Sequence, residues 1–487
     1  MNIDKINTIS ELKRSGYQSK SIRDELRDNM LKNLQNGQNV FSSIIGFDDT
    51  VIPDVERAIL SRHNILLLGL RGQAKTRIAR MLINLLDEHI PVIEGSELND
   101  DPLHPISRFG IDQIREHGDK TPITWMHRSE RYVEKLATPD VSVADLIGDV
   151  DPIKAATLKL PYSDERVIHF GLVPRAHRSV FVINELPDLQ ARIQVSLFNI
   201  LQEGDIQIRG FKLRLPLDIA FVFTANPEDY TNRGSIITPL KDRIESQVLT
   251  HYPTTIAEAK QITRQEAQIP DSQVDNIYVP ELAKNILERI AFAARESELI
   301  DEKSGVSARL TISGYENLLS TSERRALLNK DSQTVVRLID FWGVIPSITG
   351  KVELVYEGEQ EGPYNVALDL IGTAVKEEFL EYFPNPDKLT KANDVDIFED
   401  VKAWFSSGKV LDLLSSDSDQ KYEKNLNRIH GLKELAKKVS KHDRDQNIAK
   451  EFILHALAEF NVITRDLIGS KLSFRDMLAN MLDDLDN

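Results

Sequence analysis

The sequence predicts an α/β fold in which a parallel sheet is sandwiched by helices. Three short, continuous apolar runs indicate buried strands, because the strands of such a sheet are covered on both faces. They are Asn64–Leu68, Ser179–Ile183 and Ile219–Thr224. Helical patterns alternate with these runs, and this alternation is typical of α/β proteins. We therefore assign residues 41–255 to an α/β core.

The regions on both sides of this core are predicted to be helical. In residues 1–40, apolar side chains recur at helical intervals among charges, and Asn36-Gly37 supplies a turn that ends the segment. Residues 256–345 form a predicted helical lid, with helices over Leu282 to Glu298 and Ile312 to Leu328.

The last region, residues 346–487, is predicted to be mostly helical, and the sequence assigns it no role. Apolar and charged residues alternate over Lys351 to Tyr356, which predicts one strand. From about residue 365 to the end we expect helices, followed by a solvated acidic tail at Asp483 to Asn487.

Composition excludes several classes of protein. The net charge of −16 disfavours direct binding to nucleic acid, because phosphate binding depends on Lys and Arg. The absence of cysteine excludes disulfides, thiolate metal sites and cysteine nucleophiles. The polar N-terminus has no secretory signal, and no apolar run approaches the ~20 residues of a membrane span. We therefore expect a cytoplasmic protein.

A candidate phosphate loop follows the first predicted strand and opens a helix. Its residues are Gly69, Leu70, Arg71, Gly72, Gln73, Ala74, Lys75 and Thr76. Backbone N–H groups at such a turn point at phosphate oxygens, with Lys75 reaching the β- and γ-phosphates and Thr76 binding Mg2+. Ala74 stands where such loops usually have their final glycine. Alanine costs little at this position if its φ is negative. The alternative is a chance turn rich in glycine and lysine.

The second apolar run ends in Asn184-Glu185. In ATPases with such a loop, the strand beside the loop strand ends in two acids, one for Mg2+ and one for the attacking water. Glu185 is the candidate catalytic base. Asn184 occupies the metal position, where its amide oxygen can hold a metal-bound water but adds no charge. The alternative makes Glu185 an acid at a helix N-terminus.

Two further residues complete the candidate site. Asn226 ends the third apolar run, where a short polar side chain can orient the attacking water, although Asn-Pro turns are common. Arg243 follows at the edge of the core and could reach the γ-phosphate of a neighbouring subunit. The alternative for Arg243 is a surface pair with Asp242.

Taken in order, these motifs resemble the AAA+ superfamily, in particular the group that holds the magnesium-chelatase ATPase subunit and the MoxR ATPases. The resemblance covers about residues 41–320. Beyond the phosphate loop, it is carried by Ile44–Asp48, Asp145–Asp151, Phe170–Arg178, Leu201–Gly204 and a hairpin insert over Ile206 to Leu215.

The resemblance implies a role for each candidate residue and a set of ligands and partners. Lys75 and Thr76 would be Walker A, Asn184 and Glu185 Walker B, Asn226 sensor 1, Arg243 the arginine finger and Arg309, in Ser307-Ala308-Arg309, sensor 2. It also implies ATP and Mg2+ as ligands and a homo-oligomeric ring, expected to be a hexamer. The segment Glu94–Pro102, with Pro105, is similar to the chelatase branch, which implies an adaptor protein with an integrin-like metal-binding domain.

The preferred function is therefore an ATPase motor that remodels or activates a protein partner. One alternative is the motor subunit of a metal chelatase, although the scattered histidines His104, His127, His169 and His177 form no tetrapyrrole site. Another is a nucleotide-gated scaffold with weak hydrolysis, which Asn184 keeps open. A sigma-54-type regulator is disfavoured because the sequence lacks a G-A-F-T-G-A loop and a helix-turn-helix.

Overall fold

In the computed structural model, the chain divides into two compact units, Met1–His251 and Tyr252–Asn487. The structure describes residues 3–161, 164–208, 214–227, 235–388, 396–468 and 471–477. Within those ranges, no helix combines the length and the apolar character that crossing a membrane requires. The predicted boundaries at residues 40, 255 and 345 remain predictions.

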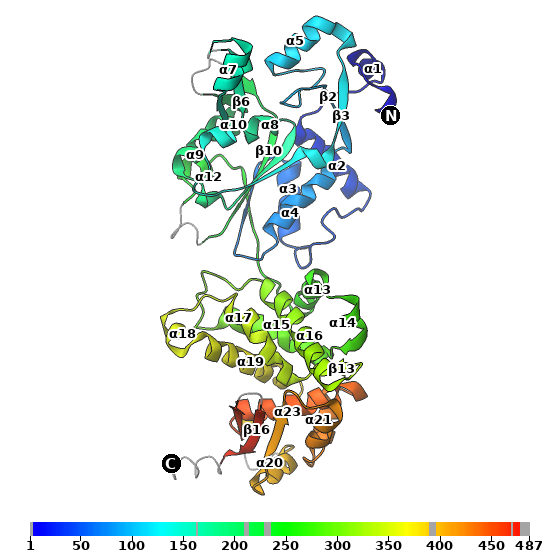
Figure 1. The fold of residues 1–487 in the computed structure, drawn as a ribbon, viewed down its shortest axis with the longest axis vertical. Helices are drawn as coiled ribbons and strands as arrows, with labels where there is room; N and C mark the ends of the chain where they lie inside the picture. Colours follow the sequence, from blue (N-terminus) through cyan, green and yellow to red (C-terminus); the bar gives the residue numbers. More distant parts are fainter. Residues whose placement is uncertain are drawn as a thin grey trace. The chain divides into compact units, whose positions relative to one another are not determined.

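A five-stranded parallel sheet organises the first unit (Figure 1). Its strands, in spatial order, are β11 (Ser246–Leu249), β1 (Ile65–Leu68), β10 (Ile219–Ala225), β7 (Ser179–Asn184) and β4 (Tyr132–Leu136). The three predicted apolar runs form β1, β7 and β10, so the predicted α/β class is confirmed. The expected neighbour relationship is wrong, because β10 lies between β1 and β7 and pairs with both.

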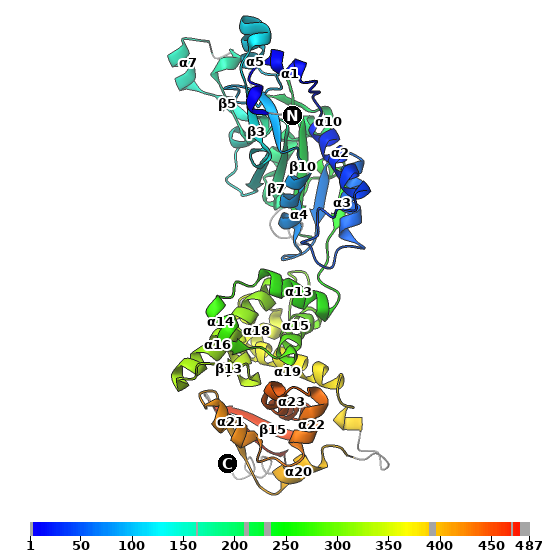
Figure 2. The ribbon, with the colours of Figure 1, turned by 90° about the vertical axis from the view of Figure 1, so that its right-hand side faces the viewer.

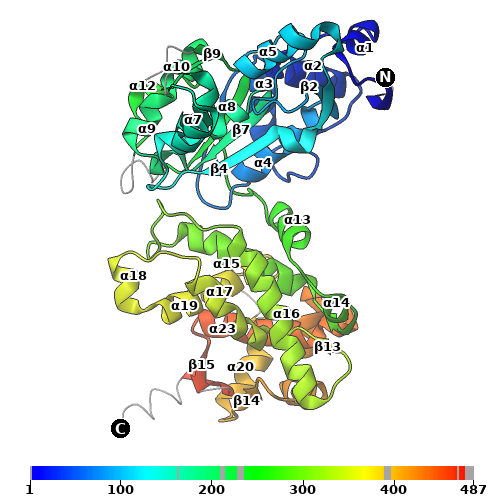
Figure 3. The same cartoon turned by 45° about the horizontal axis from the view of Figure 1, so that its top comes forward.

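Separate apolar cores cover the two faces of this sheet. Along β7, Val180 and Val182 pack against helices on one face, whereas Phe181 and Ile183 pack against helices on the other. The helices of the first face are α2 (Ile22–Gln35), α3 (Val51–Leu60) and α4 (Lys75–Met81). Those of the second are α6 (Val143–Leu146), α8 (Leu172–Arg175), α9 (Ala191–Ser196), α10 (Phe198–Glu203) and α12 (Thr238–Lys241). Figure 3 shows α2, α3 and α4 on the opposite side of the strands from α9, α10 and α12.

The N-terminal segment forms two helices, α1 (Ile9–Arg14) and α2, and the second belongs to the core. The guanidinium of Arg131 donates two hydrogen bonds to Glu25 of α2, at 2.7 and 2.6 Å. Their side chains are only 1% and 5% exposed. A carboxylate oxygen of Asp218 accepts the backbone N–H of Ile22 at 2.7 Å, so it caps α2 from the start of β10. The polar segment is therefore anchored to the sheet.

The first unit also contains three antiparallel strand pairs and two further helices outside the five-stranded sheet. The pairs are β2 (His89–Ile93) with β3 (Ile123–His127), β5 (Gly148–Val150) with β6 (Ile168–Phe170), and β8 (Asp205–Gln207) with β9 (Arg214–Pro216). The helices are α5 (Arg108–His117) and α7 (Pro152–Leu158). The β8–β9 pair confirms the expected hairpin insert, whose residues 209–213 lie outside the described part.

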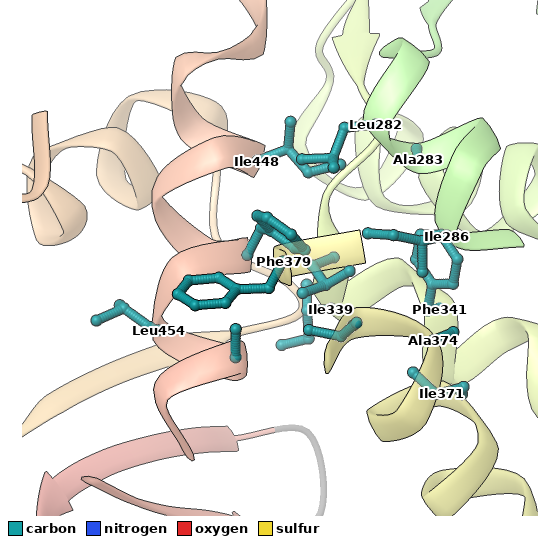
Figure 4. Packing of buried hydrophobic residues seen from close by; sticks show 14 of the residues in the cluster. Leu282, Ala283, Ile286, Ile339, Phe341, Ile371, Ala374, Phe379, Ile448 and Leu454 are labelled. Carbon is teal, nitrogen blue, oxygen red and sulfur yellow. The ribbon is translucent and has the colours of Figure 1, made fainter. Parts of the chain in front are cut away.

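The second unit is built mainly from helices around one apolar core (Figures 2 and 4). Its first helices are α13 (Ile256–Glu266), α14 (Asp271–Asn276), α15 (Glu281–Glu296), α16 (Arg309–Asn329), α17 (Ile345–Thr349), α18 (Tyr356–Glu361) and α19 (Pro363–Leu380). Phe379 of α19 lies at the centre of Figure 4, between Ile286 of α15 and Leu454 of a later helix. The two long predicted helices are confirmed as α15 and α16. Two short strands, β12 (Ile277–Tyr278) and β13 (Thr334–Val335), pair beside them.

The end of the chain corrects two predictions. After α20 (Glu399–Ser406), α21 (Asp419–Leu426), α22 (Leu432–Val439) and α23 (Gln446–Glu459) pack with a three-stranded antiparallel sheet. Its strands are β14 (Leu411–Leu414), β15 (Ile463–Ile468) and β16 (Lys471–Asp476). The expectation of helices to the end is therefore wrong, because short apolar runs do not distinguish strand from helix. The predicted acidic tail lies outside the described residues.

The strand expected over Lys351 to Tyr356 is also absent from the described structure. Leu354 makes only an isolated bridge to Ile300, and α18 begins at Tyr356. The alternating pattern is therefore satisfied by one bridge rather than by a strand, since no neighbouring strand is available along its length.

Candidate nucleotide-binding site

Polar residues gather where β1, β7 and β10 end. The three strands are parallel and in register, with Leu68 opposite Ala225 and Phe223 opposite Ile183. Their carboxyl ends therefore meet at one edge of the sheet, the usual position of ligand sites in open α/β sheets. The phosphate loop, Asn184-Glu185 and Asn226 all follow these ends.

The phosphate loop adopts an unusual backbone at Ala74. This residue has φ 55° and ψ 12°, the left-handed region, and directly precedes α4. Alanine would cost little here only at a negative φ, and this condition is not met, so the residue carries about 1–2 kcal/mol of strain. At Gly69 an added Cβ would collide with the side chains of Thr250 and Gln73 and would have to displace them. Those two side chains bond at 2.8 Å and fasten the loop to the end of β11.

Lys75 lies inside the loop and is only 7% exposed. Its Nζ donates to the carbonyl oxygen of Leu70 at 2.8 Å, to that of Gly69, and to Oδ1 of Asn226 at 2.7 Å. A phosphate oxygen is a stronger acceptor than a carbonyl or amide oxygen, because its negative charge strengthens the hydrogen bond to an ammonium. Lys75 is thus positioned where an anion at the loop would be bound favourably.

Asn184 connects the loop to the next two strands. Its Oδ1 accepts from the Thr224 hydroxyl at 3.1 Å and from the Thr76 hydroxyl at 3.5 Å. The backbone N–H of Glu185 donates to the same Thr224 hydroxyl at 3.1 Å. The candidate metal ligands Thr76 and Asn184 are therefore in direct contact, and Thr224 holds them next to Glu185.

Glu185 and Asn226 also form a pair. Nδ2 of Asn226 donates to Oε2 of Glu185 at 3.2 Å. Glu185 has φ 55°, and this left-handed turn ends β7 and begins the short 3-10 helix Leu186–Asp188. Its side chain makes no capping bond to that helix, but Glu185 does lie at the N-terminus of the helix, so the alternative of an acid at a helix N-terminus stays open. The carboxylate also contacts Asn226 of the site.

A residue that sequence reasoning missed lies behind Asn184. Oε1 of Glu134, in β4, accepts from Nδ2 of Asn184 at 2.6 Å, and Arg80 of α4 donates to both carboxylate oxygens, at 2.9 and 3.1 Å. Burial alone would raise the pKa of Glu134, but bonds from Arg80, Tyr132 and Asn184 lower it below its usual value. The half-exposed strand β4 has no continuous apolar run, so the sequence offered no signal for it.

The two arginines of the predicted site are not among these contacts. Arg243 donates to Oε1 of Gln202 at 3.1 Å and to the carbonyl oxygen of Pro239 at 2.7 Å, and it stacks on Phe198. Among the described contacts it forms no pair with Asp242. Arg309 is the first residue of α16, in the second unit. Their predicted roles toward a phosphate therefore remain predictions.

The donor set fits Mg2+ bound together with phosphates. Among the described residues, no group of three or more His, Cys, Asp or Glu side chains could hold a metal ion. Thr76 and Asn184 supply hard, neutral oxygens, and Mg2+ commonly binds to few protein oxygens plus substrate phosphates. Mg2+ would supply Lewis-acid polarisation of the phosphates once bound there.

Comparison with known proteins gives only weak similarity. No family model matches the chain. NtrX from Brucella abortus is 13% identical with a TM-score of 0.36, and the match covers 60% of this chain and 55% of NtrX, so the chain spans about half of that protein. A chain in the structure of the complex between subunits BchI and BchD of magnesium chelatase is 19% identical with a TM-score of 0.35. This match covers 66% of the present chain and 98% of the matched chain. A protein of Cytophaga hutchinsonii is 16% identical with a TM-score of 0.28, and the match covers 74% of this chain and 97% of that protein chain. Similarities this low carry no information on activity.

Proposed function

We propose that the unit Met1–His251 binds ATP with Mg2+ at this site and that the chain is an AAA+ ATPase. One observation carries the proposal. The side-chain amide of Asn226 joins Lys75 to Glu185, accepting from the first at 2.7 Å and donating to the second at 3.2 Å. A phosphate-binding cation and a candidate base therefore share one orienting group.

The chemistry of the site follows from these neighbours. Lys75 and the loop N–H groups would bind the β- and γ-phosphates, while Thr76 and Asn184 would hold Mg2+. Glu185 would accept a proton from the attacking water, which Asn226 would orient by hydrogen bonding. The protein contributes mainly positioning and charge stabilisation, as is usual in phosphoryl transfer.

The finer function extends this chemistry to an assembly. We infer that copies of the chain form a ring, expected to be a hexamer, in which Arg243 reaches the nucleotide of a neighbour. Arg309 would contact the γ-phosphate from the helical lid. Nucleotide turnover would then remodel or activate a protein partner in the cytoplasm, with an adaptor bearing an integrin-like metal-binding domain as the expected contact.

A second candidate is a nucleotide-gated scaffold that hydrolyses ATP weakly, and the neutral Asn184 favours it. Steady-state ATP hydrolysis by the wild-type chain and by Glu185→Gln separates the two. A motor requires the wild type to exceed the variant by at least about a hundredfold, because a general base contributes ~10²–10⁴-fold. Equally slow turnover in both proteins, together with tight ATP binding, would leave the scaffold as the function.

A further inference from the structure

We propose that Glu134 is a positioning residue of the magnesium site, which fixes the amide of Asn184 so that its oxygen faces Thr76. The inference rests on the proposed function, because it assigns a role toward the Mg2+ of bound ATP. It follows from the contacts of one side chain, the Asn184 amide.

The two ends of this amide have different chemistry. A carboxylate can only accept hydrogen bonds, so the group 2.6 Å from Glu134 has to be the NH2 of Asn184. The oxygen of the amide then points to the opposite side, toward the hydroxyls of Thr224 and Thr76. Without the carboxylate the amide could turn over and present NH2, which cannot ligate a cation.

The hydrogen-bond chain through these residues has one consistent direction. The N–H of Glu185 occupies an acceptor site of the Thr224 hydroxyl, which therefore donates its proton to Asn184. Asn184 in turn donates to Glu134. Each donor meets an acceptor from β10 through β7 to β4, so turning over the amide would break both ends of this chain.

Glu134 is itself held rigidly. Arg80 binds both of its carboxylate oxygens, and the Tyr132 hydroxyl donates to Oε2 at 3.2 Å. The side chain of Glu134 is 22% exposed. Because the bidentate pair with Arg80 is neutral as a whole, Glu134 adds little charge to the site. Its contribution is orientation, in the way that outer partners orient metal ligands.

This arrangement also explains why an acid does not suit position 184. The substitution Asn184→Asp would restore the acid that such sites usually have, but it would place a second carboxylate against Glu134. Two adjacent carboxylates repel, and both are acceptors. Asn184→Asp should therefore help only together with Glu134→Gln, which removes the competing carboxylate.

The test measures how much Mg2+ increases nucleotide affinity. A fluorescent ATP analogue is titrated into the full chain with Mg2+ and with EDTA, for the wild type, Glu134→Gln, Asn184→Asp and the double variant. Glu134→Gln should lower the Mg2+ enhancement about tenfold while leaving the affinity in EDTA unchanged. Asn184→Asp alone should not raise the enhancement, whereas the double variant should exceed both single variants.

Glu130→Gln is the matched control, since it makes the same chemical change at an exposed residue just before β4 and should behave as wild type. Thermal unfolding without nucleotide verifies that each variant is folded. An unchanged enhancement in Glu134→Gln, or independent effects of the two substitutions, would overturn the inference while leaving the proposed function intact. If the wild type binds no nucleotide under either condition, the proposed function itself fails.

Discussion

The ammonium of Lys75 lies 2.7 Å from the amide oxygen of Asn226, at the carboxyl edge of the parallel sheet. The same lysine is bonded to carbonyl oxygens of its own loop. Lys75 therefore ties the loop to the end of β10. Under the proposed function, it also offers its charge to a phosphate.

Lys75→Ala should weaken ATP binding and also destabilise the first unit. Losing one charge-assisted hydrogen bond costs about 1.5–3 kcal/mol, which corresponds to a ~10- to 100-fold loss of affinity. The loss of the internal bonds should lower the unfolding free energy by a similar amount. Titration with a fluorescent nucleotide and urea unfolding measure the two effects. Lys120→Ala, at an exposed lysine, is the control, and equal ATP affinity of both variants would refute the site.

Ala74→Gly should stabilise the protein, which is unusual for a change to glycine. The left-handed φ of 55° strains alanine but not glycine. After the larger entropy of glycine in the unfolded chain is subtracted, a gain of about 0.5–1 kcal/mol remains. Ala156→Gly, at an exposed position inside α7, should instead destabilise by about 1 kcal/mol. Urea unfolding of both variants measures the signs, and the same sign for both would contradict the strain at Ala74.

Arg243→Ala should abolish ATP hydrolysis while leaving ATP binding intact, if the residue acts across a ring interface. Mixing provides a sharper test, because Arg243→Ala retains its base and Glu185→Gln retains its arginine. In mixed rings, some interfaces combine an intact base with an intact arginine. Turnover should therefore reappear when the two inactive variants are mixed, as measured by phosphate release. No recovery in mixed assemblies would argue against a role of Arg243 in trans.

The stability of the second unit should depend on pH through Glu288. Burial raises the pKa of this glutamate from 4.5 to about 7, although hydrogen bonds from Thr263 and Thr311 oppose the shift. Its contribution to stability is therefore complete below pH 4.5 and is lost as the pH rises through 7. Glu288→Gln should remove this loss, which amounts to about 3 kcal/mol because one pKa unit corresponds to ~1.4 kcal/mol.

Urea unfolding of the wild type and of Glu288→Gln at pH 4.5 and pH 8 measures this effect. As the pH rises, the unfolding free energy of Glu288→Gln should increase relative to that of the wild type. Contributions from other titrating groups cancel in this difference. Glu298→Gln, at an exposed glutamate after α15, should follow the wild type. A constant difference between wild type and Glu288→Gln would contradict the raised pKa.

Glu25→Ala should destabilise the first unit strongly, because it leaves Arg131 buried without its partner. Removing one member of a buried ion pair typically costs about 3–5 kcal/mol. Lys13→Ala breaks an exposed pair with Asp119, whose side chains are 53% and 62% exposed, and should cost less than about 1 kcal/mol. Thermal unfolding ranks the two variants. Equal effects would mean that the buried pair of Glu25 and Arg131 does not stabilise the first unit more than an exposed pair does.

Local pattern determined a large part of this protein. Continuous apolar runs identified β1, β7 and β10, because both faces of each strand are buried and its side chains are therefore apolar on both sides. The polar residues after these strands predicted Lys75, Glu185 and Asn226 as site residues, because the sequence itself shows where each strand ends. The contacts among them agree with one shared site.

Tertiary structure decided what depends on pairing between distant segments. Strand order is non-local, so the sequence did not show that β10 lies between β1 and β7. The same holds for Glu134, which meets Asn184 only because β4 pairs with β7. The sign of φ at Ala74 is set by how the loop is fastened, not by the residue itself. The sequence therefore predicted Lys75, Glu185 and Asn226 as members of one candidate site, whereas the packing of strands added Glu134 and determined how these side chains are oriented.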